Sequence, residues 1–411
     1  MSFSQGLSGL TASASNLDVI GNNIANSGTI GFKSGTVQFA DVFTGTQIGL
    51  GAKVSAVSQN FNAGAVQTSA RVLDVAIVEG DGFFRMKSPG GEIAYSRNGQ
   101  FNKDKDGFIV NASGLQLTGH KVDAAGVVGV GLEALQLPSA AMVPKATGEI
   151  AAQFNLDARA IVPAAAPFDA TKSATYNYSN SVKVYDSLGN PHELATFFVK
   201  TSLVASGTSG TWDVYATADS DAVPKTTPPS TVGQLTFNDS GKLVTPANGI
   251  IALNGIDFGN GSALMDLNVA VTGTTQFGSA SDVKQLDQDG YTSGTLAGFS
   301  IGKDGILTGK YSNEQSKMLG QIVLSSFVNP AGLQSKGDNV WTETAASGQS
   351  LTGNPGAGTK LGALASGSLE ASNVDLTSEL VNLIIAQRTY QANAQTVKTQ
   401  DQVVQTLMNL R

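Results

Sequence analysis

Residues 375–411 read DLTSELVNLIIAQRTYQANAQTVKTQDQVVQTLMNLR, and this C-terminal stretch decides the predicted fold. Its apolar residues recur in alternating steps of three and four, the heptad spacing of a helix with one packing seam. The seam consists of Leu376, Leu380, Leu383, Tyr390, Ala394, Val397, Val404 and Met408. Because no Gly or Pro interrupts the stretch, we expect one helix, about 55 Å long at ~1.5 Å per residue. Asp375 or Thr377 is suited to cap its first turn.

The N-terminal residues 3–26 carry the same spacing. Their seam consists of Phe3, Leu7, Leu10, Ala14, Leu17, Gly21 and Ile24. Two helices with seams at opposite ends of one chain predict that the termini pack together as a coiled coil. The chain between them then forms the body of the molecule.

The surface of both predicted helices is unusual for a free-standing coiled coil. Between Ser2 and Asn26 only Asp18 is charged, and the second helix fills many outer positions with Gln and Thr rather than Glu and Lys. Val381, Ile384 and Ile385 lie off the seam. This part of the helix is therefore apolar nearly all round, which is typical of a helix buried on several sides.

Two arrangements explain such helices. They form either a helical hairpin within one chain, or a hairpin whose outer faces are covered by neighbouring subunits, and we favour the second. It predicts a polymer interface formed by Phe3, Leu7, Leu10, Ala14, Leu17, Ile24, Leu376, Leu380, Leu383, Ile384, Ile385, Tyr390, Val397, Val404 and Met408.

Several motifs carry a resemblance to a known family. They are NLDVIGNNIAN at 16–26, TIGFK at 29–33, YSRNGQF at 95–101, LGQIVL at 319–324 and LEASNVDL at 369–376. The first two and the last resemble the terminal signatures of the flagellar rod and hook proteins, and the middle two resemble the hook branch of that family. The resemblance spans nearly the whole chain and is weakest from about 146 to 285.

Composition agrees with a structural, turn-rich protein. The 411 residues include 48 glycines, about 12 per cent against a usual ~7 per cent, and only 14% are charged. A net charge of -7 argues against nucleic acid or an anionic membrane as partner. Cysteine is absent, which excludes disulfides and thiolate metal sites. Neither a Sec-type signal nor a stretch able to cross a bilayer is expected, so we predict no membrane insertion.

The middle of the chain reads as β structure with a nested organisation. Residues 29–70 are broken by Gly into a connector with some β pairing. Alternating apolar residues then predict strands and tight turns in 71–145 and 286–369, which we assign to one inner β domain. Residues 146–285 form an outer β domain inserted into it, and 1–28 with 370–411 form the terminal helical polymerisation domain. The predicted fold is thus mostly β with paired long terminal helices.

The sequence offers few candidates for a metal-binding or catalytic site. Residues 102–107 place Asn102, Asp104 and Asp106 at the alternate positions of a calcium loop, but Ser113 stands where an EF-hand has its bidentate Glu. We expect a simple hairpin turn there. His120 and His192 lack any metal-ligand or nucleophile spacing and are expected to be structural. The sequence predicts no catalytic, metal-binding or cofactor-binding residue and no enzyme.

The resemblance implies a structural subunit that polymerises into the flexible, curved tube of the flagellar hook and transmits torque from rod to filament. Its implied partners are other copies of itself, the rod, hook-cap and hook–filament junction proteins, and the flagellar type III export apparatus, which would deliver it outside the cell. A distal rod subunit is the alternative within the family, but such proteins are shorter and lack so large an inserted region. A secreted enzyme or adhesin on a β scaffold is the alternative outside it.

Overall fold

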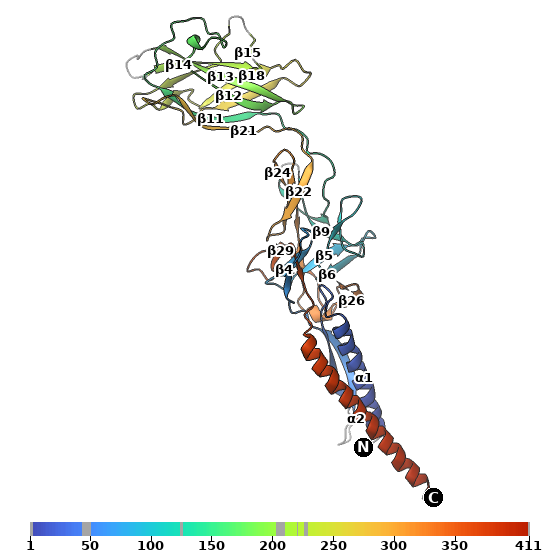
Figure 1. The fold of residues 1–411 in the computed structure, drawn as a ribbon. Helices are drawn as coiled ribbons and strands as arrows, with labels where there is room; N and C mark the ends of the chain where they lie inside the picture. The colour runs from blue at the N-terminus through green and yellow to red at the C-terminus, as the bar shows by residue number, and fades with distance from the viewer. Residues whose placement is uncertain are drawn as a thin grey trace. The chain divides into compact units, whose positions relative to one another are not determined.

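The computed structural model describes residues 3–42, 51–123, 126–202, 210–219, 221–225 and 229–409. Within them the protein is mostly β, with helix α1 (Phe3–Ala25) near one terminus and helix α2 (Leu376–Asn409) near the other (Figure 1). The chain forms two compact units. The first comprises Met1–Ser139, Ala297–Lys310 and Ser316–Arg411, and the second comprises Ala140–Leu296 and Tyr311–Gln315.

Helix α2 begins where the sequence predicts. Asp375 is its N-cap: the carboxylate Oδ1 accepts the backbone N–H of Thr377 at 2.9 Å and that of Ser378 at 3.3 Å. Hydrogen bonds from the Ser378 hydroxyl and from these backbone groups lower the pKa of Asp375. The carboxylate therefore stays ionised and complements the partial positive charge of the helix N-terminus.

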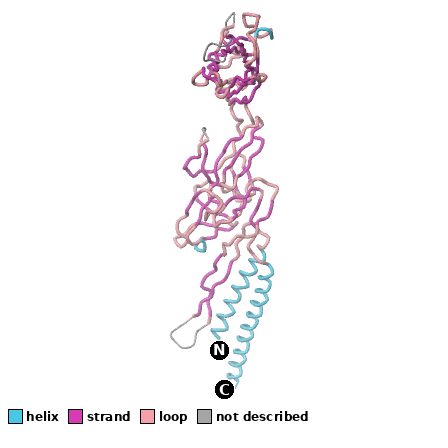
Figure 2. The backbone as a smooth tube through the Cα atoms, turned by 90° about the vertical axis from the view of Figure 1, so that its left-hand side faces the viewer, coloured by secondary structure: helices cyan, strands magenta, loops and turns pink. Residues whose placement is uncertain are grey.

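Helix α1 lies beside a β-hairpin as well as beside α2 (Figure 2). Strands β1 (Gly35–Asp41) and β2 (Ala52–Gln59) pair antiparallel from Gly35 opposite Gln59 to Asp41 opposite Ala52. Both strands contact α1. Much of the predicted connector is thus a hairpin against the helix, and its residues 43–50 lie outside the described part of the chain.

The large sheet of the first unit has 13 strands among the described residues, with β22-β23-β24-β9-β5-β6-β27-β26 as its longest path. These strands are β22 (Leu296–Ile301), β23 (Ile306–Tyr311), β24 (Ser316–Ile322), β9 (Gln116–Val122), β5 (Phe83–Lys87), β6 (Ile93–Ser96), β27 (Val340–Thr342) and β26 (Gln334–Gly337). Off this path lie β7 (Asn102–Lys103), β8 (Ile109–Val110), β10 (Val128–Ala134), β25 (Leu324–Ser326) and β28 (Leu351–Gly353). Two further pairs join β4 (Val75–Val78) to β29 (Ala363–Ser366) and β3 (Val66–Thr68) to β30 (Ser368–Glu370).

The core of this unit joins segments from both halves of the chain. Phe84, Leu117, Leu307 and Leu324 are all completely buried in one cluster. A second cluster consists of Phe83, Tyr95, Phe327 and Trp341, whose rings meet edge to face. Because strands before residue 140 pack on strands after 296, neither half can bury its apolar face alone.

A buried ionic centre lies where α1, the hairpin, the β body and α2 meet. Glu370 Oε1 lies 2.6 Å from Lys33 Nζ and accepts the backbone N–H of Gly64 at 2.8 Å. Glu370 Oε2 lies 3.4 Å from Nη1 of Arg97. Lys33 Nζ also donates to the carbonyl of Asn62, and Arg97 Nη2 donates to that of Gly80.

Burial is the dominant electrostatic effect on both cations of this centre. It lowers the pKa of Lys33 and of Arg97, while the Glu370 carboxylate opposes this by favouring their charged forms. The side chains of all three residues are at most 1% exposed. Removing the carboxylate would leave two cations away from water without the ion pair that they share.

The second unit is built from two sheets among its described residues. One has the order β12-β13-β14-β16-β17 with β15 on β14, and the other has the order β18-β19-β11-β20 with β21 on β11. The first contains β12 (Tyr178–Tyr185), β13 (Pro191–Ser202), β14 (Gly210–Ala218), β15 (Asp221–Val223), β16 (Gly233–Phe237) and β17 (Leu243–Thr245). The second contains β11 (Glu149–Asp157), β18 (Ile250–Ile256), β19 (Met265–Ala270), β20 (Thr275–Phe277) and β21 (Asp282–Gln288). Both contribute to one hydrophobic core around Trp212, Leu235 and Leu267.

Some sequence expectations hold and others do not. The loop after Asn102 is a hairpin turn, because Asp104 Oδ1 accepts the N–H groups of Asp106 and Phe108 between the paired strands β7 and β8. The sequence pattern over 107–117 predicts one continuous strand, and this prediction is wrong. Asn111 Oδ1 accepts two backbone N–H groups there, and Gly114 has φ +78°, so a turn separates β8 from β9. The expected boundary at 285 falls inside β21.

The buried centre generates a stability prediction. We expect Glu370→Gln to lower the free energy of unfolding of the first unit by about 3–5 kcal/mol, because two buried cations lose the carboxylate that pairs with both of them. Urea unfolding in a Trp212→Phe background would follow this unit through Trp341 fluorescence. Glu133→Gln is the control, since the ion pair of Glu133 with Lys121 is exposed, and it should change stability little. A Glu370→Gln protein as stable as its parent would contradict the prediction.

Candidate functional site

The residues predicted to form the interface all lie on α1 and α2, and none of those whose side chains are described is buried within the single chain. Leu10, Ala14, Leu17, Ile24, Leu383 and Val397 are half-buried. Phe3, Leu7, Leu376, Leu380, Ile384, Ile385, Tyr390, Val404 and Met408 are exposed. The structure therefore gathers them on one helical pair and leaves most of them without cover.

On α1, the contact between the two helices uses a different stripe from the predicted seam. The buried residues of α1 are Gly6, Ala12, Ser13, Ile20 and Asn23. A Cβ atom at Gly6 would lie 2.8 Å from Cγ2 of Val397, and one at Gly9 would lie 2.9 Å from the Asn393 side chain. Small residues thus allow the helices to approach closely. Sequence reasoning missed this stripe because it weighted large apolar residues, whereas small ones carry little hydropathy signal.

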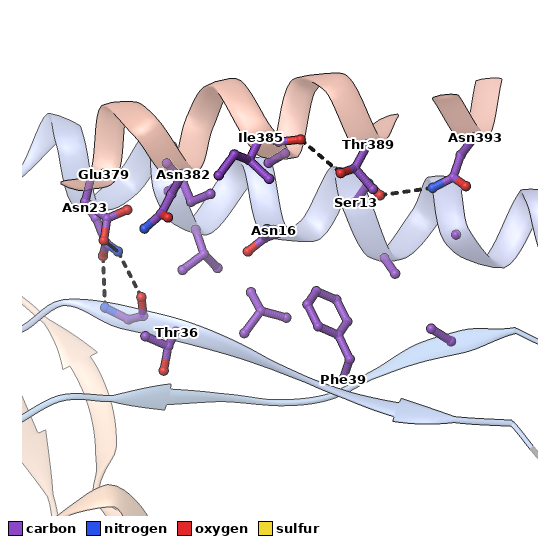
Figure 3. A pocket seen from close by; sticks show the side chains of 18 residues that line it. Ser13, Asn16, Asn23, Thr36, Phe39, Glu379, Asn382, Ile385, Thr389 and Asn393 are labelled. Carbon is purple, nitrogen blue, oxygen red and sulfur yellow. Dashed lines mark hydrogen bonds between the residues drawn. The ribbon is translucent and has the colours of Figure 1, made fainter. Parts of the chain in front are cut away.

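A groove of about 480 Å³ runs between α1, α2 and β1. Figure 3 shows Asn16, Asn382 and Ile385 of the two helices facing it together with Thr36 and Phe39 of the hairpin. Its lining mixes the side chains of Val19, Val37 and Phe39 with several amides and hydroxyls. The groove is therefore not a dry apolar cavity, and Glu379 is the charged residue in its lining.

Hydrogen bonds fix one end of this groove. Asn23 Nδ2 donates to the carbonyl of Gly35 at 2.8 Å, and the N–H of Gly35 donates back to Asn23 Oδ1 at 2.9 Å (Figure 3). Asn23 Nδ2 also lies 3.4 Å from Glu379 Oε1. The second carboxylate oxygen, Glu379 Oε2, is buried and accepts no hydrogen bond from the described residues. Asn23 thereby ties α1 to both the hairpin and α2.

Polar clusters elsewhere have structural roles. In the second unit, His192 Nδ1 lies 2.6 Å from Asp219 Oδ2, its Nε2 lies 3.2 Å from Asp186 Oδ2, and its ring stacks on Phe258. Burial by itself raises the pKa of Asp186, but hydrogen bonds from Asn190 and Asn260 outweigh it and lower that pKa.

In the described part of the chain no group of three or more His, Cys, Asp or Glu residues is placed to hold a metal ion. None of the described helices combines the length and apolar character needed to cross a membrane.

Comparison with known sequence families defines the class of protein. The Flagella basal body rod protein family matches residues 5–33, and the Flagellar hook protein FlgE/F/G D1 domain matches 77–156. The Flagellar basal body protein FlaE D2 domain matches 155–291, and the Flagellar basal body rod FlgEFG protein C-terminal family matches 365–410. Together they assign the chain to the structural proteins of the flagellar basal body and hook.

Individual relatives narrow this class. The chain is 45% identical over 416 residues to the flagellar hook protein FlgE of Salmonella typhimurium, covering 100% of both chains. It is 33% identical to the FlgE of Borreliella burgdorferi, covering 99% of this chain and 98% of the relative. A crystal structure of Helicobacter pylori flagellar hook protein FlgE2 shares the fold, with a TM-score of 0.51 at 14% identity over 74% of this chain and 99% of that one. The chain belongs to the flagellar hook protein family, and these full-length matches favour a hook subunit over a distal rod subunit.

The close helix contact generates the second prediction. Gly6→Leu should separate α1 from α2 and lower the helical content of the free chain, because its Cβ atom has no room beside Val397. Gly21→Leu is the matched control. A Cβ atom at Gly21 meets nothing within 4 Å, so the same substitution should keep or raise helicity. Far-ultraviolet circular dichroism with urea titration would measure both, and equal behaviour of the two variants would contradict the close contact.

Proposed function

We propose that this hook subunit polymerises through its terminal helices into a curved, flexible tube that acts as a universal joint between rod and filament. The observation that carries the proposal is the uncovered apolar face of α2. Leu376, Leu380, Val381, Ile384 and Ile385 are 45–57% exposed, although they lie close together within about three turns of one helix. Such a face in a soluble protein is typical of a surface that another molecule covers.

The free energy gained by burying apolar side chains supports assembly at this face. Burying one large aliphatic side chain is worth about 1.5–3 kcal/mol when it is fully removed from water. In the free chain, each exposed side chain lacks much of this burial free energy. Contact with a neighbouring subunit would supply it. The interface between identical subunits must be head-to-tail, because a head-to-tail contact that does not close produces a helical assembly. The fifteen residues of the predicted interface are our proposed contact set.

The nested organisation suggests a division of mechanical roles. We assign the tube wall to 1–28 and 370–411, paired as a coiled coil, and sliding outer contacts to the inserted domain at about 146–285. The inner β domain at 71–145 and 286–369 lies in the chain between the terminal helices and the inserted domain. The connector at 29–70 absorbs displacement of the helices relative to the β domains. A rotating bent tube must lengthen and shorten on each side in every turn. Firm helical contacts with weaker outer contacts meet that requirement.

The same proposal specifies partners and location. The subunit would leave the cell through the flagellar type III export apparatus. It would then contact the rod at one end of the hook, the hook-cap protein during growth, and the hook–filament junction proteins at the other end. Membership of the hook protein family supports these partners, and no nucleic acid or membrane lipid is among them.

A charge placed on the proposed interface should block assembly. Ile384→Asp puts a carboxylate on the apolar face of α2, and burying it without a partner would cost several kcal/mol, on the order of 3–5. We expect the variant to remain in the supernatant on sedimentation, with β structure unchanged by circular dichroism. Leu383→Asp should behave in the same way.

Gln391→Asp is the matched control for this experiment. It introduces the same charge into the same helix at an exposed position that is already polar, so it should still give sedimenting polymers. Polymers formed normally by Ile384→Asp would mean that this face stays open to solvent in the assembly, and the interface proposal would then be wrong.

Excision of the second unit separates assembly from mechanics. Met142 and Gly294 pair across antiparallel backbone, with N–H to carbonyl distances of 2.7 and 3.3 Å, so a short Gly-Ser linker can join the chain there. The shortened protein keeps α1 and α2. We expect it to form tubes that are straighter or differently curved, as seen by electron microscopy.

Two results would count against this division of roles. Failure of the folded, shortened protein to form any tube would make the second unit essential to assembly. Tubes of unchanged curvature would remove its mechanical role.

A further inference from the structure

Four Asn-Gly pairs occur in the sequence, at 98–99, 248–249, 254–255 and 260–261. In such a pair the backbone nitrogen of the glycine can attack the side-chain amide of the asparagine, because glycine has no side chain to hinder the approach. The attack needs an asparagine side chain that is free to rotate and open space around the glycine. The fold provides these two conditions unequally at the four pairs.

The pair at 98–99 is held in close packing. Asn98 Oδ1 accepts the backbone N–H of Gln100 at 3.0 Å. Gly99 is buried, and a Cβ atom at this position would overlap the carbonyl oxygen of Val75. Neither the side chain nor the backbone of this pair has room to rearrange.

The pair at 248–249 is restrained in a similar way. Asn248 Oδ1 accepts the N–H of Ile250 at 3.2 Å, and the N–H of Gly249 donates to the carbonyl of Pro246 at 2.9 Å. A Cβ atom at Gly249 would overlap the hydroxyl of Thr272. The nitrogen that would have to react is therefore bound within a turn.

Both ends of the amide are held at the pair 260–261. Asn260 Nδ2 donates to Asp186 Oδ2 at 2.6 Å, and Asn260 Oδ1 accepts the N–H of Ser262 at 3.0 Å. Rotation of this side chain would break both hydrogen bonds, which opposes the attack.

The pair at 254–255 differs from the other three. It lies in β18, which stands at one end of its sheet's strand order among the described residues. The register with β19 shifts between Leu253 and Ile256, so Asn254 and Gly255 form a bulge opposite Asp266. The Asn254 side chain is exposed and makes no hydrogen bond with the residues that the structure describes. A Cβ atom at Gly255 would meet nothing within 4 Å.

A carboxylate contacts the nitrogen that would react. Asp266 Oδ1 accepts the backbone N–H of Gly255 at 2.8 Å. The reaction must remove this proton, and the distance lies within the range for transfer to a general base. The bulge thus combines a mobile amide, an unhindered nitrogen and a proton acceptor.

We propose that Asn254 and Gly255 form a self-modifying site, in which the Gly255 nitrogen attacks Cγ of Asn254 while Asp266 takes up the proton. A bond forms between this nitrogen and Cγ, and the bond from Cγ to Nδ2 breaks. The amide leaves as ammonia with the proton that Asp266 held, and a cyclic succinimide remains. Water then opens the ring, its hydroxyl adding to a carbonyl carbon and its hydrogen returning to the nitrogen. Addition at Cγ gives aspartate, and addition at the backbone carbonyl carbon gives isoaspartate.

The product changes the edge of the second unit. A neutral amide becomes a carboxylate on the strand opposite Asp266, and like charges across a strand pair are destabilising. Isoaspartate also adds one carbon to the backbone of β18. The pairing of β18 with β19 should therefore weaken as the molecule ages. This change consumes water alone and does not depend on the proposed assembly.

Incubation of the native full-length chain in mildly alkaline buffer tests the site. Samples taken over time would be digested with pepsin in acid, and fragment mass spectra would locate each conversion of amide to acid. We expect position 254 to react about tenfold faster than the other three, which corresponds to about 1.4 kcal/mol of activation free energy. Transfer of a labelled methyl group by protein isoaspartate methyltransferase gives an independent measure of isoaspartate.

Three variants test the chemistry. Asn254→Gln should abolish the reaction at this position, because glutamine would have to close a larger ring. Asp266→Asn keeps an oxygen that can accept the Gly255 N–H but removes the carboxylate, so it should slow the reaction severalfold. Asp257→Asn is the matched control. It removes the same charge just after β18, where the carboxylate accepts the N–H of Gly259, and should leave the rate at position 254 unchanged.

The same incubation in urea separates the fold from the local sequence. All four pairs should react at similar rates in the unfolded chain, because the restraints on the other three are gone. Position 254 leading by the same margin in urea would assign the preference to local sequence and overturn the inference. Equal rates at the four positions in the native protein would also overturn it. An unchanged rate in Asp266→Asn would overturn the role of Asp266 as proton acceptor.

Discussion

The buried carboxylate of Glu370 is the interaction on which the rest of the first unit depends. It lies just before α2 and holds Lys33, which follows α1, and Arg97, which belongs to the β body. The backbone of Gly64, after the hairpin, also donates to it. One side chain thereby connects four segments that are far apart in the sequence. A buried charge set of this kind adds little net stability, but losing one member is costly, so it fixes how the helices leave the β body.

This fixed junction explains how the helical pair can expose so much apolar surface and still keep its position on the β body. Helices α1 and α2 bury small and polar residues against one another, including Gly6, Ser13 and Asn23. Many of their large apolar residues are exposed, and nothing among the described residues covers them. Short, weakly charged helices have little stability of their own. Anchoring at Glu370 and the hairpin contact of Asn23 keep the pair in register while its outer face remains available to other molecules.

Assembly and flexibility then place different demands on different parts of the chain. A polymer wall needs large apolar contacts between subunits, and the outer faces of the two helices offer them. The second unit instead has a large hydrophobic core of its own between two sheets. Membership of the hook protein family agrees with this combination.

Much of this protein was determined by its sequence alone. The heptad spacing predicted both terminal helices, Asp375 was identified as a possible cap, and alternating apolar residues predicted β structure between the helices. Only the tertiary structure decided which stripe of α1 faces α2, since glycine carries little hydropathy signal and the side chains of α2 that approach Gly6 and Gly9 are known only from the fold. Only it brought Lys33, Arg97 and Glu370 together, because the partners of a buried charge depend on contacts across more than 270 residues, and local spacing does not encode them.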